Sequence, residues 1–187
     1  AMPGHKGLYG PQGTGLLLCG GAADPLLEGG TGSVSLRQEM PDFLPDRLEA
    51  GTHNIAGIAG LLEGLRFLQR REQAGLAARE EDLIRRLGEG LSHLPGIEVY
   101  LAPRGSGAQS SVLSFRIQGR DCEELGEALG RRGVALRAGL HCAPLAHRTV
   151  GTLESGTLRA SVSAFTLPEE ISRVLVIVEE LLRERAV

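Results

Sequence analysis

A histidine and a lysine stand side by side in the segment GHKGLYGPQGTG at residues 4–15. A lysine whose amine is neutral can attack a carbonyl carbon and hold a cofactor aldehyde as a Schiff base. The glycines beside Lys6 would let the backbone approach such a bound group closely. The same residues also suit a solvated lysine followed by a glycine-rich turn. The segment is not a Walker phosphate-binding loop, because it lacks Gly-Lys-Ser/Thr at the required spacing.

A thiol follows an imidazole in the segment RAGLHCAPLAH at residues 137–147. The thiolate is the reactive form of cysteine, and a nearby cation such as Arg137 stabilises it. Cys142 is therefore a candidate nucleophile, and the alternative is a small buried core residue. We expect no metal site here, because His147 is the only further ligand available nearby.

Two other segments carry groups that can bind an anion. Arg159 stands in a strand-like segment, and alternation places it on the face opposite the apolar residues. Its guanidinium can hold a carboxylate with two hydrogen bonds, or it can face water. The loop EGGTGS at residues 28–33 offers the hydroxyls of Thr31 and Ser33 and consecutive backbone N–H groups. The alternative for this loop is an ordinary flexible connection.

Residues 76–187 contain enough elements to position such groups in a self-contained α+β unit. Apolar residues at helical spacing predict a helix to about residue 94, one from Asp121 to Gly133, and a last one from a capping box at Thr166. Strands are predicted over residues 97–102, 110–117, 134–138 and 157–163. We expect the helices to cover one face of a mainly antiparallel sheet.

Residues 2–75 offer fewer elements. They contain one short strand that we expect to be buried, at residues 14–19, two glycine-rich loops, and one helix from Asn54 onward. The apolar stripe of that helix consists of Ile55, Ile58, Leu61, Leu62, Leu65 and Leu68. This set is too small to close a hydrophobic core by itself.

The composition excludes two classes of partner. The 187 residues carry a net charge of −3 with both signs interspersed, which does not favour nucleic-acid binding. The apolar runs are too short to cross a membrane. Three cysteines do not form a disulfide framework, so we expect a reducing, cytoplasmic location, with Cys19 and Cys122 as small buried residues.

Five segments in order resemble the cysteine desulfurase and selenocysteine lyase group of the class V aminotransferases. They are GHKGLYGPQGTG, GGTGS, PDRLEAGTHNIAGI, RAGLHCAP and LRASVSAFTLPEEI, and together they extend over practically the whole chain. The resemblance implies an α/β protein with the fold type I of pyridoxal-phosphate-dependent transferases. Residues 2–75 would then be a remnant of the large cofactor-binding domain, and residues 76–187 the small domain.

The resemblance also implies a cofactor site for pyridoxal 5′-phosphate. Lys6 would form the Schiff base with the cofactor, and His5 would lie near the cofactor phosphate. Thr31, with Ser33 beside it, would belong to a loop that reaches the phosphate of a partner subunit. A homo-oligomer is therefore expected.

For the substrate, the resemblance implies that Cys142 takes sulfur from cysteine as a persulfide and releases alanine. Arg159 would bind the substrate carboxylate, with Arg137 and His141 nearby. The substrate is cysteine or selenocysteine, and a sulfur-acceptor protein of iron–sulfur cluster assembly is an expected partner.

The resemblance places Lys6 near the middle of a two-domain chain of about twice this length. We therefore expect this chain to be the C-terminal half of such an enzyme, inactive by itself. One alternative is a split enzyme completed by a separate N-terminal chain. The other is a module without enzymatic activity that binds a sulfur acceptor or carries sulfur.

Overall fold

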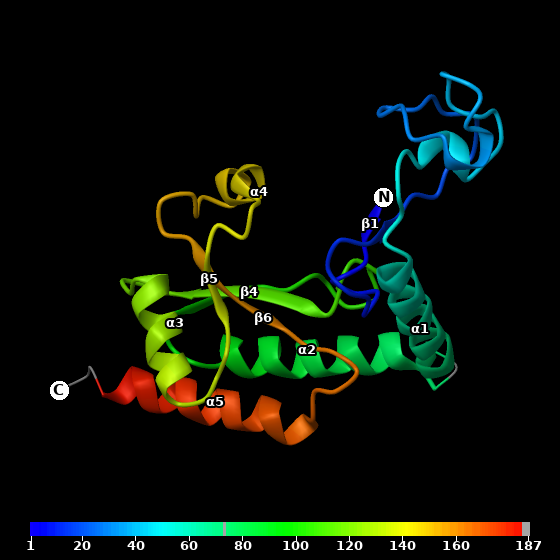
Figure 1. Cartoon of the computed structure of the whole chain (residues 1–187). Coiled ribbons are helices and arrows are strands. Elements are labelled where there is room, and N and C mark those ends of the chain that lie inside the picture. The colour runs from blue at the N-terminus through cyan, green and yellow to red at the C-terminus, as the bar shows by residue number, and fades with distance from the viewer. Residues whose placement is uncertain (73, 185–187) are drawn as a thin grey trace. The chain divides into compact units, whose positions relative to one another are not determined.

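The computed structural model describes residues 1–72 and 74–184 and divides into two compact units, Ala1–Ala74 and Gly75–Val187 (Figure 1). The predicted domains, residues 2–75 and 76–187, include residues 73 and 185–187, which lie outside the described residues. Among the described helices, none combines the length and the apolar character needed to cross a bilayer.

The second unit is built on a four-stranded antiparallel sheet. Its strand order is β3 (Ile97–Tyr100), β4 (Val112–Ile117), β6 (Thr157–Ser161) and β5 (Arg137–Gly139). Three helices lie on one face of the sheet: α2 (Leu76–Ser92), α3 (Cys122–Arg131) and α5 (Pro168–Arg183). The short helix α4 (Pro144–Thr149) lies in the connection between β5 and β6, away from the other helices (Figure 1). The predicted α+β arrangement is confirmed, whereas α4 was not predicted.

The core of this unit follows from alternation along β4. Leu113, Phe115 and Ile117 are buried toward the helices, and Ser114 and Arg116 point to the opposite face. The buried side chains that pack with them from the helices are Leu83, Ile84, Leu87, Leu91, Leu125, Leu129, Ile171, Val178 and Leu181. Each fully buried side chain of this size contributes about 1.5–3 kcal/mol to folding. This continuous core makes the sheet a rigid support for groups on its open face.

The helix ends agree with the sequence at α3 and differ at α5. Asp121 accepts hydrogen bonds from the backbone N–H groups of Glu123 and Glu124 at 2.8 and 2.9 Å, as expected for an N-cap. At α5 the predicted cap at Thr166 is wrong by one residue, because the helix begins at Pro168 and Leu167 occupies the N-cap position. Proline is pre-organised for the first helical position, which fixes the start.

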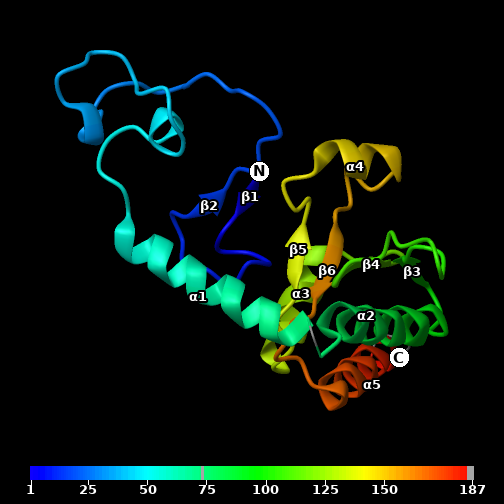
Figure 2. The ribbon, with the colours of Figure 1, turned by 90° about the vertical axis from the view of Figure 1, so that its right-hand side faces the viewer.

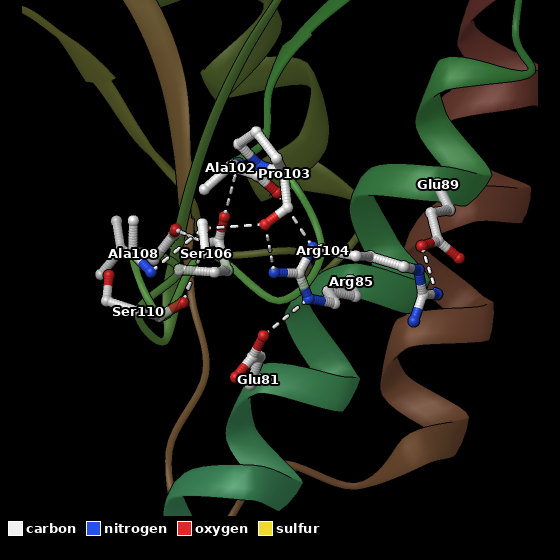
Figure 3. Close-up of polar contacts among 11 residues, drawn as sticks. Glu81, Arg85, Glu89, Ala102, Pro103, Arg104, Ser106, Ala108 and Ser110 are labelled. Carbon is white, nitrogen blue, oxygen red and sulfur yellow. Dashed lines mark hydrogen bonds and ion pairs between the residues drawn. The ribbon is translucent and has the colours of Figure 1, made fainter.

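A buried arginine attaches the segment after β3 to helix α2. Arg85 is 5% exposed, and its Nε donates to the Glu81 carboxylate at 2.7 Å. Its Nη1 and Nη2 donate to the carbonyl oxygens of Ala102 and Pro103 at 3.0 and 3.4 Å (Figure 3). The charge is thus neutralised and hydrogen-bonded, as burial of an arginine requires.

The first unit has a small two-stranded sheet, β1 (Met2–Pro3) and β2 (Gly15–Leu16), beside the long helix α1 (Ile55–Glu72) (Figure 2). The prediction of a buried strand over residues 14–19 is wrong, because Leu17 and Leu18 are 62% and 76% exposed. Part of the apolar stripe of α1 is also exposed, namely Ile55, Ile58 and Leu62. Among the described residues of this unit, no second layer packs over these side chains.

Candidate active site

Lys6 lies in the turn between β1 and β2, with its side chain exposed. The Gly4 N–H donates to the Thr14 carbonyl at 2.8 Å, and the Gly10 N–H donates to the Gly4 carbonyl at 2.8 Å. A Cβ on Gly4 would lie 2.3 Å from the Thr14 hydroxyl oxygen, so glycine is required there. The turn therefore presents Lys6 on a closely hydrogen-bonded backbone rather than on a frayed end.

Helix α1 supports this turn through a row of glycines. A Cβ on Gly64 would lie 2.4 Å from the Leu8 carbonyl oxygen, and one on Gly60 would lie 3.2 Å from the Pro11 ring. Gly57 lies on the same face, three residues before Gly60. Sequence reasoning treated α1 as an apolar helix and missed this row. The recurrence of glycine at helical spacing in the sequence could have indicated this row.

The loop with Thr31 and Ser33 contains three glycines with positive φ, at 102°, 58° and 26° for Gly29, Gly30 and Gly32. The Thr31 hydroxyl donates to the Val34 carbonyl at 3.1 Å. Thr31 lines a hollow of about 580 Å³, whereas Ser33 does not line it. The loop lies away from the turn after β1 in both views of this unit (Figures 1 and 2).

Polar groups around this hollow suit an anion. Ser35, Arg37 and Thr52 line it together with Thr31. A guanidinium and backbone N–H groups of glycines are donors that bind phosphate in proteins. The Thr31 and Ser35 hydroxyls donate to the Val34 and Gly32 carbonyls here and would join these donors by rotating. Sequence reasoning missed Ser35 and Arg37, although both follow the glycines closely. The residues present thus fit a phosphate group.

In the second unit, two arginines lie next to each other on the open face of the sheet. Arg137 of β5 pairs directly with Arg159 of β6. Arg159 is half-buried, its Nε is fully covered, and this atom has no hydrogen-bond partner among the described residues. Two like charges placed opposite each other destabilise a sheet unless an anion joins them. The two positive charges therefore favour binding of an anion such as a carboxylate or a thiolate.

Cys142 follows β5, and its thiol is exposed. The Arg137 Nη2 atom lies 3.8 Å from its Sγ atom. Cys142 and His141 both adopt left-handed backbone conformations, with φ of 59° and 54°. Such a conformation costs roughly 1–2 kcal/mol for a residue with a Cβ. The turn that presents the thiol must accordingly be held by its surroundings.

His141 attaches this turn to the sheet. Its Nε2 lies 3.1 Å from the carbonyl oxygen and 3.1 Å from the hydroxyl of Thr157. Because a carbonyl oxygen only accepts, Nε2 carries the proton in this contact, and Nδ1 is buried without a partner among the described residues. Burial and, next, the charge of Arg159 lower the pKa of His141. The neutral imidazole is thus favoured beside Cys142.

The other two cysteines differ from each other. Cys122 is buried, as predicted, and burial raises the pKa of its thiol. Cys19 is exposed, so the prediction that it is a buried core residue is wrong. It follows β2, where the apolar side chains are also uncovered. Within the described residues, no group of three or more metal-ligating side chains occurs.

The structure thus gathers the predicted site residues in two separate sets. Cys142, Arg137, His141 and Arg159 lie together at the end of β5 and β6 in the second unit. His5, Lys6, Thr31 and Ser33 belong to the first unit. Within that unit no described hydrogen bond joins the turn with Lys6 to the loop with Thr31.

The family model and the relatives found by sequence comparison point to the same family. Residues 1–174 match the family model of class V aminotransferases. The chain is 38% identical over 176 residues to a probable cysteine desulfurase of Mycolicibacterium paratuberculosis, covering 90% of this chain and 24% of that protein. It is 33% identical over 190 residues to a probable cysteine desulfurase of Methanothermobacter thermautotrophicus, covering 97% of this chain and 46% of that protein.

Solved structures agree with the sequence relatives. The cysteine desulfurase CsdA of Escherichia coli superposes with a TM-score of 0.82 at 30% identity, over 97% of this chain and 45% of that one. The apo cysteine desulfurase of Thermococcus onnurineus gives a TM-score of 0.77 at 29% identity, over 97% and 46%. The chain therefore spans less than half the length of these proteins, and it has the fold type I expected from its motifs.

Proposed function

The chain belongs to the class V aminotransferase family, and on that basis we propose that it forms the part of a cysteine desulfurase that binds the substrate and accepts its sulfur. One observation carries the proposal. Arg159 is half-buried, its Nε has no hydrogen-bond partner among the described residues, and it pairs with Arg137, whose Nη2 lies 3.8 Å from the exposed thiol of Cys142. A carboxylate site and a nucleophilic sulfur are thus adjacent, as removal of sulfur from an amino acid requires.

Arg159 would bind the carboxylate of cysteine or selenocysteine. Its position on a strand within a packed sheet fixes the direction of the guanidinium, and two parallel hydrogen bonds would orient the substrate. His141 would contribute a neutral imidazole at the same end of the sheet, because burial lowers its pKa. Its unpartnered Nδ1 can accept a hydrogen bond from the substrate.

Cys142 would attack the sulfur of the substrate as a thiolate. A sulfur–sulfur bond forms, the bond between sulfur and the substrate β carbon breaks, and its electron pair remains on the carbon, which is protonated to give alanine. The product on the protein is a persulfide at Cys142, which an acceptor protein of iron–sulfur cluster assembly would receive. Arg137 would stabilise the anionic sulfur during both steps.

The first unit would hold pyridoxal phosphate, which supplies an electron sink for bonds at the α and β carbons of an amino acid. Lys6 would bind the aldehyde, and His5 would lie near the phosphate. The hollow lined by Thr31, Ser35 and Arg37 fits a phosphate by its donors. We assign this hollow to the cofactor of a partner subunit, with Ser33 in the same loop but outside the lining, so that the active assembly is a homodimer.

The chain covers only 24–46% of the sequence relatives named above. We propose that residues 2–75 are a part of a large cofactor-binding domain and that residues 76–187 belong to the small domain. Activity would then require further polypeptide of the kind that the relatives have outside the matched range. Without it, cofactor binding is expected to be weak and the chain inactive, and a separate chain could supply it.

Lys6 allows an unusually direct test, because it is the only lysine in the sequence. The protein is mixed with pyridoxal phosphate, reduced with borohydride and mapped by peptide mass spectrometry. We expect the cofactor mass on Lys6 and its loss in Lys6→Arg, with the α-amino group as the only other primary amine. Adducts confined to the α-amino group would contradict the cofactor assignment.

A second candidate function is that of a sulfur-carrying module, and the exposed Cys142 on a unit with its own core favours it. Persulfide at Cys142 distinguishes the two. Once the further polypeptide is supplied, an enzyme forms it from cysteine only with Lys6 and the cofactor, and releases an equal amount of alanine. A carrier accepts it from a persulfide donor equally well in Lys6→Arg.

A further inference from the structure

The segment between β5 and β6, residues 140–156, contains two buried polar side chains that the proposed chemistry does not use. His147 of helix α4 is 6% exposed, and Thr152 is fully buried. The His147 Nδ1 lies 2.8 Å from the Thr152 hydroxyl oxygen, and the Thr152 N–H donates to the His147 carbonyl at 2.8 Å. Residues 147 and 152 are thus joined through both side chain and backbone.

This pair lies against the residue that precedes the reactive thiol. The rings of His147 and His141 have centroids 5.7 Å apart and are tilted by 46°. His141 is also hydrogen-bonded through Nε2 to Thr157, which is 1% exposed. The His141 ring therefore contacts both a buried strand residue and a histidine whose own orientation is fixed by Thr152.

The backbone at this point needs such support. His141 and Cys142 both have φ in the left-handed region, which residues with a Cβ disfavour. If the His141 ring were free, the turn could relax to ordinary φ values. Relaxation would move the Cys142 thiol from its position 3.8 Å from the Arg137 guanidinium.

We propose that His147, oriented by Thr152, is a positioning residue for Cys142. It packs against His141 and holds the left-handed turn that keeps the thiol beside Arg137. The inference deepens the proposed function, since it concerns the thiol assigned there as the sulfur acceptor. The position of the Cys142 thiol is a property of the chain itself and does not depend on bound cofactor.

The test is the alkylation rate of Cys142 by iodoacetamide, measured by mass spectrometry in the full chain. Cys19 is exposed and lies in the other unit, so its rate in the same molecules serves as an internal reference. In Thr152→Val the isosteric side chain lacks the hydroxyl. We expect the ratio of the Cys142 rate to the Cys19 rate to fall about fivefold, the equivalent of one neutral hydrogen bond.

Matched variants separate positioning from simple packing. Thr152→Ser keeps the hydroxyl and should restore the ratio. His147→Phe keeps a buried ring without nitrogen and should lower the ratio as Thr152→Val does. His147→Gln retains a hydrogen-bonding group, so its ratio should lie between those of Thr152→Ser and His147→Phe. If Thr152→Val does not fold, the comparison of His147→Gln with His147→Phe replaces it.

Coupling to the arginine completes the test. Arg137→Gln should lower the ratio by itself, and adding Thr152→Val should lower it little further, because both changes remove the same contact. Unchanged ratios in folded Thr152→Val and His147→Phe would overturn the inference, as would equal losses in Thr152→Ser. Absence of the reduced cofactor adduct from Lys6 would contradict the proposed function and leave these alkylation ratios unaffected.

Discussion

Arg159 combines a proposed role in substrate binding with a cost for folding. Its guanidinium is half-buried, its Nε lacks a partner among the described residues, and it faces a second arginine across the strand pair. A buried donor without a partner costs about 1–3 kcal/mol. The site therefore contains a charge that the folded chain alone does not satisfy.

We predict that Arg159→Met leaves the free energy of unfolding unchanged or raises it by about 1 kcal/mol, because it removes an unsatisfied charge. Chemical denaturation of the chain measures this effect. In a complete assembly the same variant should lose binding of the substrate carboxylate by roughly tenfold or more, the value of a charge-assisted hydrogen bond. Clear destabilisation of the chain would show instead that Arg159 has a structural partner.

His141 leads to a prediction for pH dependence. Burial and Arg159 lower its pKa in the folded state, so the unfolded chain binds this proton more readily. Stability should therefore fall as the pH drops below the ordinary value of about 6.5, and should level off below the lowered pKa. Urea denaturation at a series of pH values measures the slope. His141→Asn should reduce it, and an unchanged slope would assign the effect to other groups.

At the scale of elements, the glycines of α1 permit close packing of the turn with Lys6, although glycine lowers helix propensity. Glycine costs about 1 kcal/mol relative to alanine inside a helix. Gly64 lies under the turn with Lys6, so a side chain there would meet the Leu8 carbonyl at 2.4 Å. The helix is thus weaker than it could be, and the turn can lie directly against it.

We predict that Gly64→Ala destabilises the chain by about 1–3 kcal/mol despite the gain in helix propensity, as is typical of overpacking. The yield of reduced cofactor adduct on Lys6 should fall with it, because the turn is displaced. Gly130→Ala in α3 is the matched control, since a Cβ there meets nothing within 4 Å. It should stabilise the chain by up to about 1 kcal/mol. Equal effects of both changes would contradict the role of close packing.

The sequence predicted most of the elements of the second unit because their partners lie in the same unit. Alternation in β4 and the cap at Asp121 were read correctly, since both depend on local patterns. Helix α4 was missed because six residues are too few to show helical periodicity. The candidate site residues were predicted from their motifs and remain a prediction, whereas the pairing of Arg137 with Arg159 depends on strand register, which no local pattern fixes.

At the scale of the whole molecule, the two units differ in how well they cover their apolar side chains. The second unit has a continuous core of buried residues on five elements. In the first, exposed leucines are numerous: Leu17, Leu18, Leu26, Leu27, Leu36 and Leu44. The sequence predicted a buried strand there because an apolar segment favours burial. Hydrophobicity alone does not show which other element, if any, covers the segment. Large uncovered apolar surfaces usually mark interfaces.

Limited proteolysis should reveal this difference. We predict that the first cuts fall within residues 17–54, where the only regular elements are two short 3₁₀ turns, Gly32–Val34 and Asp46–Leu48. The second unit should remain intact, with the amides of β4 and β6 exchanging most slowly in hydrogen-exchange measurements. Addition of a polypeptide that completes the first unit should protect residues 17–54. Early cleavage within β4 or α2 would contradict this order of stability.

The pairing of Arg137 with Arg159 across β5 and β6 also has a consequence for the choice of buffer. Sulfate or phosphate ions carry charge that such a pair attracts, and an ion that binds only the folded state stabilises it by mass action. Folded protein in these buffers would therefore melt at a higher temperature than in chloride, while its apparent affinity for an amino-acid carboxylate would be lower. Measurements of ligand binding are best made in buffers whose anions compete weakly for these two side chains.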